Sequence, residues 1–123
     1  MTLIALGINH KTAPIQVREK VAFSPSEVPE ALRALLTLPD SEEVSLLSTC
    51  NRTELYLRVN NENLVHIFDW LEHNKSLTKN ELEQYHYLYQ GEQAIAHMMK
   101  VACGLDSMIL GEPQILGQLK QSF

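Results

Sequence analysis

The stretch VSLLSTCNRTELYLRV, residues 44–59, contains two strand-like runs separated by a short polar turn. The first run, residues 44–48, is mostly apolar, and the second, residues 54–59, alternates apolar side chains with Glu54 and Arg58. Such alternation is typical of a strand with one face on a hydrophobic core. Because the turn between the runs is tight, the stretch predicts two neighbouring antiparallel strands.

Helix and strand patterns alternate upstream of this pair of strands. Residues 3–8 form a mostly apolar run that predicts a central strand. Helical spacing then predicts a short helix around residues 17–21 and a second helix that is capped by Ser26 and ends before Pro39. Pro29 is compatible with this second helix because it falls in the first turn.

The same alternation continues downstream. Apolar spacing from Leu64 to Leu71 predicts an amphipathic helix, Thr78 is placed to cap a short second one, and residues 85–89 favour a fourth strand. Another helix should end at Gly104, and a last one should begin at Gly111. The helix before Gly104 is expected to bury one apolar face made of Ala94, Ile95, Met98, Met99 and Ala102.

This order, βααβ followed by βααβ, predicts an α+β fold in which a four-stranded, mainly antiparallel sheet is covered by helices, as in ferredoxin-like domains. A chain of 123 residues has room for one such core, so residues 1–123 are expected to form a single domain. The apolar face of the last helix is still running at Phe123, which predicts that the chain is cut from a longer protein.

Composition excludes several functional classes. Hydrophobic residues make up 45% and charged residues 20%, as in folded globular proteins. Ten basic against fifteen acidic residues give a net charge of −5, the wrong sign for non-specific nucleic-acid binding. The sequence has no apolar run of about 18 residues and no basic secretory start, so we expect a cytoplasmic protein that makes no use of a membrane.

Cys50 is the candidate for covalent chemistry. It lies in the polar turn close to Arg52, where positive charge and hydrogen-bond donors can stabilise a thiolate; the alternative is a buried, inert cysteine. Cys103 is expected to be packed among apolar helix residues, and it is too far along the chain from Cys50 to suggest a zinc ribbon or a disulfide framework. His97 borders the same helix face and reads either as a hydrogen-bonded core residue or as a catalyst.

Other cofactor patterns are missing from the sequence. His66 and His73 have no third ligand at suitable spacing, so no metal site is predicted. The glycines form neither a G-x-G-x-x-G turn nor a P-loop, so no nucleotide-binding site is predicted in this chain.

Three long motifs carry a resemblance that covers almost the whole chain. They are LGINHKTAP at residues 6–14, LSTCNRTEL at residues 47–55 and GLDSMILGEPQILGQ at residues 104–118. Together, and in this order, they closely resemble the N-terminal catalytic domain of the glutamyl-tRNA reductase family. Members of that family continue into an NADPH-binding Rossmann domain and a helical dimerisation domain, which are absent from this chain.

The resemblance implies a two-stage reaction. Cys50 would attack the ester carbonyl of glutamyl-tRNA, release the tRNA and hold the glutamyl group as a thioester. NADPH, bound by the missing domain, would then reduce the thioester to glutamate-1-semialdehyde for tetrapyrrole (porphyrin) synthesis by the five-carbon route. His97 would assist, either by polarising the ester or by protonating the leaving ribose oxygen.

The resemblance also implies a set of substrate-binding residues and partners. Arg52 is expected to pair with the side-chain carboxylate of the substrate, because a planar guanidinium can bind both oxygens. The implied partners are glutamyl-tRNA and the downstream glutamate-1-semialdehyde aminomutase, with a homodimeric full-length enzyme and a monomeric fragment. The substrate-binding positions are Thr49, Asn51, Arg52, Ser107, Glu112, Pro113, Gln114 and Gln118.

Two other functions remain as alternatives from the sequence. One is a non-enzymatic α+β binding module in which Cys50 is only structural. The other is a thiol acyltransferase that uses no NADPH and loses its thioester to water. Exposure to labelled glutamyl-tRNA separates the three, because a binding module would neither accept the glutamyl group nor deacylate the tRNA.

Overall fold

The computed structural model describes residues 2–60 and 64–104. Within these ranges, strands and helices alternate in the order expected from the sequence. The elements are β1 (Thr2–Asn9), α1 (Ile15–Val21), α2 (Val28–Leu36), β2 (Ser41–Ser48), β3 (Arg52–Val59), α3 (Val65–Lys75), α4 (Lys79–Tyr85), β4 (Tyr87–Gln90) and α5 (Glu92–Ala102).

The four strands form one sheet in the order β2-β3-β1-β4. Each neighbouring pair is antiparallel, and the central strand β1 pairs with β3 along its whole length and with β4 along half of it. The expected α+β architecture and the central position of β1 are confirmed. This strand order is that of the split βαβ arrangement of ferredoxin-like domains.

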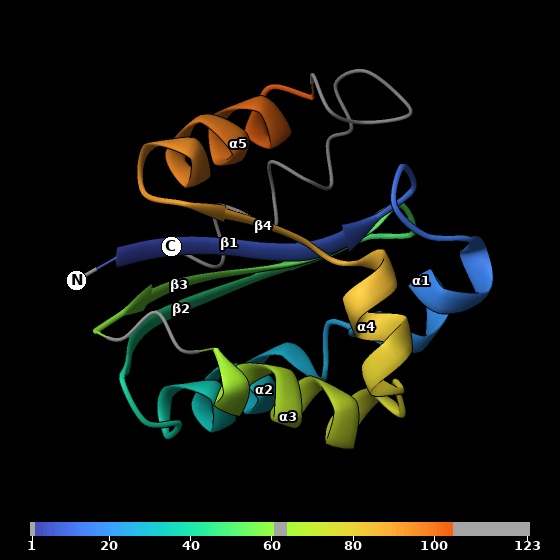
Figure 1. The fold of residues 1–123 in the computed structure, drawn as a ribbon, viewed down its shortest axis with the longest axis horizontal. Coiled ribbons are helices and arrows are strands. Elements are labelled where there is room, and N and C mark those ends of the chain that lie inside the picture. Colours follow the sequence, from blue (N-terminus) through green and yellow to red (C-terminus); the bar gives the residue numbers. More distant parts are fainter. Residues whose placement is uncertain (1, 61–63, 105–123) are drawn as a thin grey trace.

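Helices cover both faces of the sheet, but unequally. Figure 1 shows α2, α3 and α4 below the sheet and α5 alone above it. The main core lies between the sheet and α1–α4, and it is centred on fully buried residues such as Ile4, Leu35 and Leu57. A second, smaller core lies under α5 and includes Ala5, Leu47, Tyr56, Ala94 and Val101. The α5 face carries the polar groups described below.

The helix starts show one correct and one wrong expectation. Thr78 caps α4 through a complete capping box with Glu81, as its spacing predicts. Ser26 does not cap α2; Glu27 occupies the cap position and makes no side-chain cap bond. Ser26 lies inside a turn, where its hydroxyl is 3.0 Å from that of Ser24, so it points to that turn rather than to the helix start.

The buried face of α5 also differs from the expected one. Its buried residues are Ala94, His97 and Val101, whereas Ile95 is 47% exposed and Met99 is 65% exposed. Apolar residues are spread over more than half of the helix circumference, so their spacing alone does not single out the inner face. None of the helices in the described ranges has the length and apolar character needed to cross a membrane.

Candidate active site

Cys50 lies in the short turn between β2 and β3, and it is exposed. The turn is closed by the Thr49 N–H, which donates to the Arg52 carbonyl at 2.8 Å, and by the Asn51 N–H, which donates to Thr49 Oγ1 at 3.2 Å. These bonds explain the polar residues on either side of the cysteine, since side-chain oxygens satisfy backbone groups that the strands leave unpaired. The thiol is therefore accessible on a backbone of defined shape.

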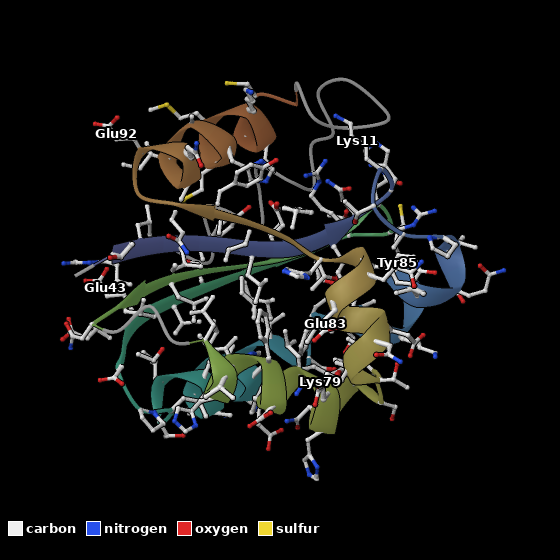
Figure 2. All side chains as sticks on the ribbon, viewed as in Figure 1. Lys11, Glu43, Lys79, Glu83, Tyr85 and Glu92 are labelled. Atoms are coloured by element: carbon white, nitrogen blue, oxygen red, sulfur yellow. The ribbon has the colours of Figure 1, made fainter. Side chains whose placement is uncertain are left out.

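Two neighbouring segments brace this turn from outside. Arg18 of α1 donates from its guanidinium to the Cys50 carbonyl at 3.3 Å. The His10 N–H, in the loop after β1, donates to the Asn51 carbonyl at 2.9 Å. That loop is itself an Asn-centred turn, because Asn9 Oδ1 accepts from the N–H of Lys11 at 2.9 Å. Figure 2 labels Lys11 on this loop, at one end of the sheet.

A buried carboxylate lies on the α5 face, four residues after Cys50. Glu54 of β3 has no exposed surface, and three groups bond to its two oxygens. Tyr56 Oη donates to Oε1, while Tyr87 Oη donates to Oε2 and His97 Nε2 lies within hydrogen-bond reach of the same Oε2. Arg52 adds a positive charge, with its guanidinium nitrogen 3.8 Å from Oε2. We call Arg52, Glu54, Tyr56, Tyr87 and His97 the Glu54 cluster.

The cluster is assembled by strand register. Residues two apart on a strand share a face, so Arg52, Glu54 and Tyr56 all point toward α5. Gly7 of β1 lies directly between Glu54 on β3 and Tyr87 on β4. A Cβ at Gly7 would lie 2.5 Å from Tyr87 Oη and 2.9 Å from Glu54 Cγ. Only a glycine lets the two side chains meet over the central strand.

Both tyrosines of the cluster remain protonated. Burial, followed by the charge of Glu54 and the hydrogen bond to it, raises the pKa of Tyr56 and of Tyr87 well above the ordinary range. The two phenols therefore act as hydrogen-bond donors, and Glu54 as their acceptor.

His97 is held on its ring faces as well as at Nε2. Its ring stacks on Tyr89 with centroids 4.6 Å apart, and it meets Tyr87 edge to face at 5.3 Å. The residue is 6% exposed. These are the surroundings of a hydrogen-bonded side chain in the core, and within the described residues the His97 ring bonds to Glu54. A catalytic role for His97 stays a prediction.

The predicted site residues fall into three groups. Thr49, Cys50 and Asn51 share the β2–β3 turn, and Arg52 begins β3 as a side chain buried beside Glu54. His97 comes to the same face of the sheet from α5. The remaining predicted positions, Ser107, Glu112, Pro113, Gln114 and Gln118, and the helix expected from residue 111, lie outside the described residues.

Cys103 corrects an expectation. Its sequence position predicts packing on the apolar face of its helix, but Cys103 is exposed. It follows Ala94 by nine residues, which is about two and a half helical turns, so it lies on the side opposite the buried Ala94. Burial therefore does not distinguish the two thiols.

Strand alternation alone does not single out Glu54, Tyr56 and Tyr87 as site residues. Two signals could have found them. Arg52, Glu54 and Tyr56 put charged and phenolic groups on one face of a strand whose other face carries Leu55, Leu57 and Val59. Gly7 interrupts an apolar strand, which points to a close approach of another group.

The described residues do not fit a metal or a dinucleotide. Within residues 2–60 and 64–104, no three His, Cys, Asp or Glu side chains gather into a group able to hold a metal ion. A Rossmann-type NADPH site needs a parallel βαβ unit with a glycine-rich turn, whereas the strand pairs described here are antiparallel. The five glycines of the whole chain, at 7, 91, 104, 111 and 117, are also too far apart.

Comparison with known proteins places the chain in a family. Residues 6–123 match the family model described as the N-terminal domain of glutamyl-tRNA(Glu) reductase. The chain is 52% identical to the glutamyl-tRNA reductase of Pseudoalteromonas translucida and 55% identical to that of Saccharophagus degradans, each time over 100% of this chain and 29% of the relative.

A solved structure agrees with these sequence relatives. The glutamyl-tRNA reductase from Methanopyrus kandleri matches with a TM-score of 0.72 and 30% identity, over 98% of this chain and 27% of that chain. The chain thus spans less than a third of the length of these relatives. Since the family model covers nearly all of it, the chain belongs to the family of glutamyl-tRNA reductase N-terminal domains.

Proposed function

We propose that this chain is the acyl-transfer domain of a glutamyl-tRNA reductase, in which Cys50 takes the glutamyl group from glutamyl-tRNA. The observation that carries the proposal is the exposed Cys50 thiol on a turn braced from α1 and from the loop after β1, in a chain of this family. A nucleophilic cysteine needs access to substrate and a fixed backbone, and this turn has both.

In the proposed step the Cys50 thiolate attacks the ester carbonyl carbon that joins glutamate to the terminal ribose. The carbon–sulfur bond forms, the carbon–oxygen bond to the ribose breaks, and the ribose oxygen takes up a proton as the tRNA leaves. The product is a glutamyl thioester on Cys50. His97 is proposed to supply that proton or to polarise the ester.

The substrate contacts stay a proposal. Thr49, Asn51 and Arg52, together with the positions outside the described residues, are proposed to bind the glutamyl group. Arg52 follows the cysteine turn in sequence, but the residue is 1% exposed and its guanidinium lies 3.8 Å from Glu54, so it reaches a substrate carboxylate only if that carboxylate enters the buried face. The alternative role for Arg52 is to hold the Glu54 cluster together.

The reduction step, the further domains and the cellular location are proposed from membership of the family. NADPH would supply the hydride that turns the thioester into glutamate-1-semialdehyde, for porphyrin synthesis; no step of it is assigned to residues described here. The same reasoning proposes a further NADPH-binding domain and a dimerisation domain beyond this chain. It also proposes a homodimeric, cytoplasmic enzyme that hands its product to glutamate-1-semialdehyde aminomutase.

A single assay tests the proposal. The chain is incubated with glutamyl-tRNA labelled in the glutamate, and we follow both label bound to protein and label released from tRNA. We expect a thioester on Cys50 in the wild type and in Cys103→Ala, and none in Cys50→Ala. Cys103→Ala is the matched control, since both thiols are exposed. Release of label from the tRNA without a trapped thioester would favour a hydrolytic acyltransferase. If label is neither bound to the protein nor released from the tRNA, the binding module is favoured.

A further inference from the structure

The hydrogen bonds of the Glu54 cluster determine which atom of each pair carries the proton. Glu54 accepts from Tyr56 on Oε1 and from Tyr87 on Oε2. A carboxylate buried with no exposed surface is stable only when it is paired and hydrogen-bonded. Two phenols that donate to its oxygens and the Arg52 guanidinium at 3.8 Å provide these partners, so the geometry around Glu54 is that of a carboxylate acceptor.

An ionised carboxylate can accept but cannot donate. The short contact between Glu54 Oε2 and His97 Nε2 therefore requires the proton to be on Nε2. The Tyr89 and Tyr87 rings pack on the imidazole from two sides and limit its rotation. Glu54 thus engages Nε2 and leaves Nδ1 as the ring nitrogen that it does not bind.

We propose that Glu54 is the positioning residue of His97: it keeps the proton on Nε2 and thereby makes Nδ1 the nitrogen that exchanges a proton with the substrate. This rests on the proposed function of Cys50. When the ester carbon–oxygen bond breaks, the leaving ribose oxygen takes its proton from Nδ1 of the imidazolium, and His97 becomes neutral with Nε2–H still bonded to Glu54. Solvent then returns a proton to Nδ1.

The surrounding groups explain why the proton stays on His97. Among the described residues, the charged and titratable side chains that contact Glu54 are Arg52 and Tyr56 from β3, Tyr87 from β4 and His97 from α5. On the neighbouring strand β1, the residue paired with both Glu54 and Tyr87 is Gly7, which has no side chain. With its oxygens already occupied by phenol donors, Glu54 orients the imidazole and stabilises its positive charge without taking the proton itself.

The first test reads the tautomer directly. Nitrogen-15 NMR of the chain with labelled histidine distinguishes a protonated from an unprotonated ring nitrogen, and the His97→Asn variant assigns the His97 signals among the five histidines. We expect Nε2–H at His97. His86 is the internal reference, because its Nδ1 lies 2.6 Å from the Leu82 carbonyl and must carry the proton there. A neutral His97 with its proton on Nδ1 would overturn the proposal, whatever happens to any variant.

The second test links the tautomer to acyl transfer. Glu54→Gln keeps the shape but places an amide that can donate to Nε2, so we expect a changed tautomer and at least about a 100-fold slower single-turnover thioester formation. Tyr87→Phe should cost about tenfold. The matched control, Glu43→Gln, removes an exposed carboxylate that pairs with Arg58, and it should change neither the His97 tautomer nor the rate of thioester formation. Figure 2 places Glu43 at the end of the sheet away from Lys11.

The outcomes separate this inference from the proposed function. A folded Glu54→Gln chain that forms thioester within about threefold of the wild-type rate, too little for lost proton transfer, would refute the positioning role and leave the proposed function intact. A wild-type chain that forms no thioester refutes the proposed function, and with it the role of Nδ1 in catalysis. If Glu54→Gln fails to fold, the wild-type NMR reading and the rate of Tyr87→Phe still decide the matter.

Discussion

Replacing Gly7 with alanine should destabilise the domain by crowding the Glu54 cluster. The added methyl would lie 2.5 Å from Tyr87 Oη, 2.7 Å from Tyr87 Cζ and 2.9 Å from Glu54 Cγ. Neither side chain can move freely, because the Tyr87 hydroxyl and the Glu54 carboxylate are bonded to each other. Gly7→Ala therefore tests whether the cluster depends on the missing side chain at this position.

The expected cost follows from three contributions. Overpacking costs about 1–3 kcal/mol, and a lost hydrogen bond to the charged Glu54 costs about 1.5–3 kcal/mol. Removing a strand glycine gives back about 0.5–1 kcal/mol of backbone entropy. The net loss should be about 3 kcal/mol, which for a domain of this size lowers the melting temperature by about 10–15 °C.

Thermal denaturation of a double-mutant cycle checks the cause as well as the size. In Tyr87→Phe the closest atom to the new methyl is gone, so Gly7→Ala should cost clearly less in that background than in the wild type. Gly91→Ala is the control: Gly91 has φ of 59° and nothing within 4 Å of a new Cβ, so its cost is backbone strain that does not couple to Tyr87. Full stability of Gly7→Ala, or costs that simply add, would refute the crowding argument.

Four further outcomes are expected. Arg52→Lys should weaken glutamyl transfer by at least about 1.5 kcal/mol, because an ammonium cannot make a two-pronged contact; a normal transfer rate would assign Arg52 to the cluster alone. The hydrogen bond from Lys75 lowers the pKa of Glu27 from 4.5 to about 2, so ionised Glu27 contributes to the free energy of unfolding above pH 4.5, and this contribution is lost as the pH falls through about 2. When stability is measured against falling pH, Glu27→Gln should lack this loss. Thr78→Ala should cost about 1 kcal/mol in chemical denaturation, because it removes the capping box of α4. The 123-residue chain should make no semialdehyde from glutamyl-tRNA and NADPH, since its glycines form no dinucleotide turn; aldehyde trapping against a full-length reductase checks this.

The sequence by itself determined the elements and their order. Strand alternation in residues 54–59, the apolar run before it and the capping box at Thr78 depend on residues close together in the chain, so they could be read without a structure. Cys50 could be singled out in the same way, because its polar neighbours belong to one turn and its motif is continuous.

Sequence patterns did not predict which face of α5 is buried or which residue starts α2. On α5, apolar residues occupy more than half of the circumference, and only contact with β1 and β4 decides that His97 turns inward while Ile95 and Met99 turn outward. The exposure of Cys103 follows from the same rotation of the helix. At α2, the preceding turn uses the Ser26 hydroxyl and leaves Glu27 at the helix start.

Only the tertiary structure decided the Glu54 cluster. Its members come from β3, β4 and α5, and they meet because β1 places Gly7 directly between Glu54 and Tyr87. Such register is set by pairing between strands far apart in sequence, so no local pattern contains it. A charged residue on a strand normally faces water; Glu54 is buried because two phenols, an imidazole and a guanidinium from other positions replace the water around it.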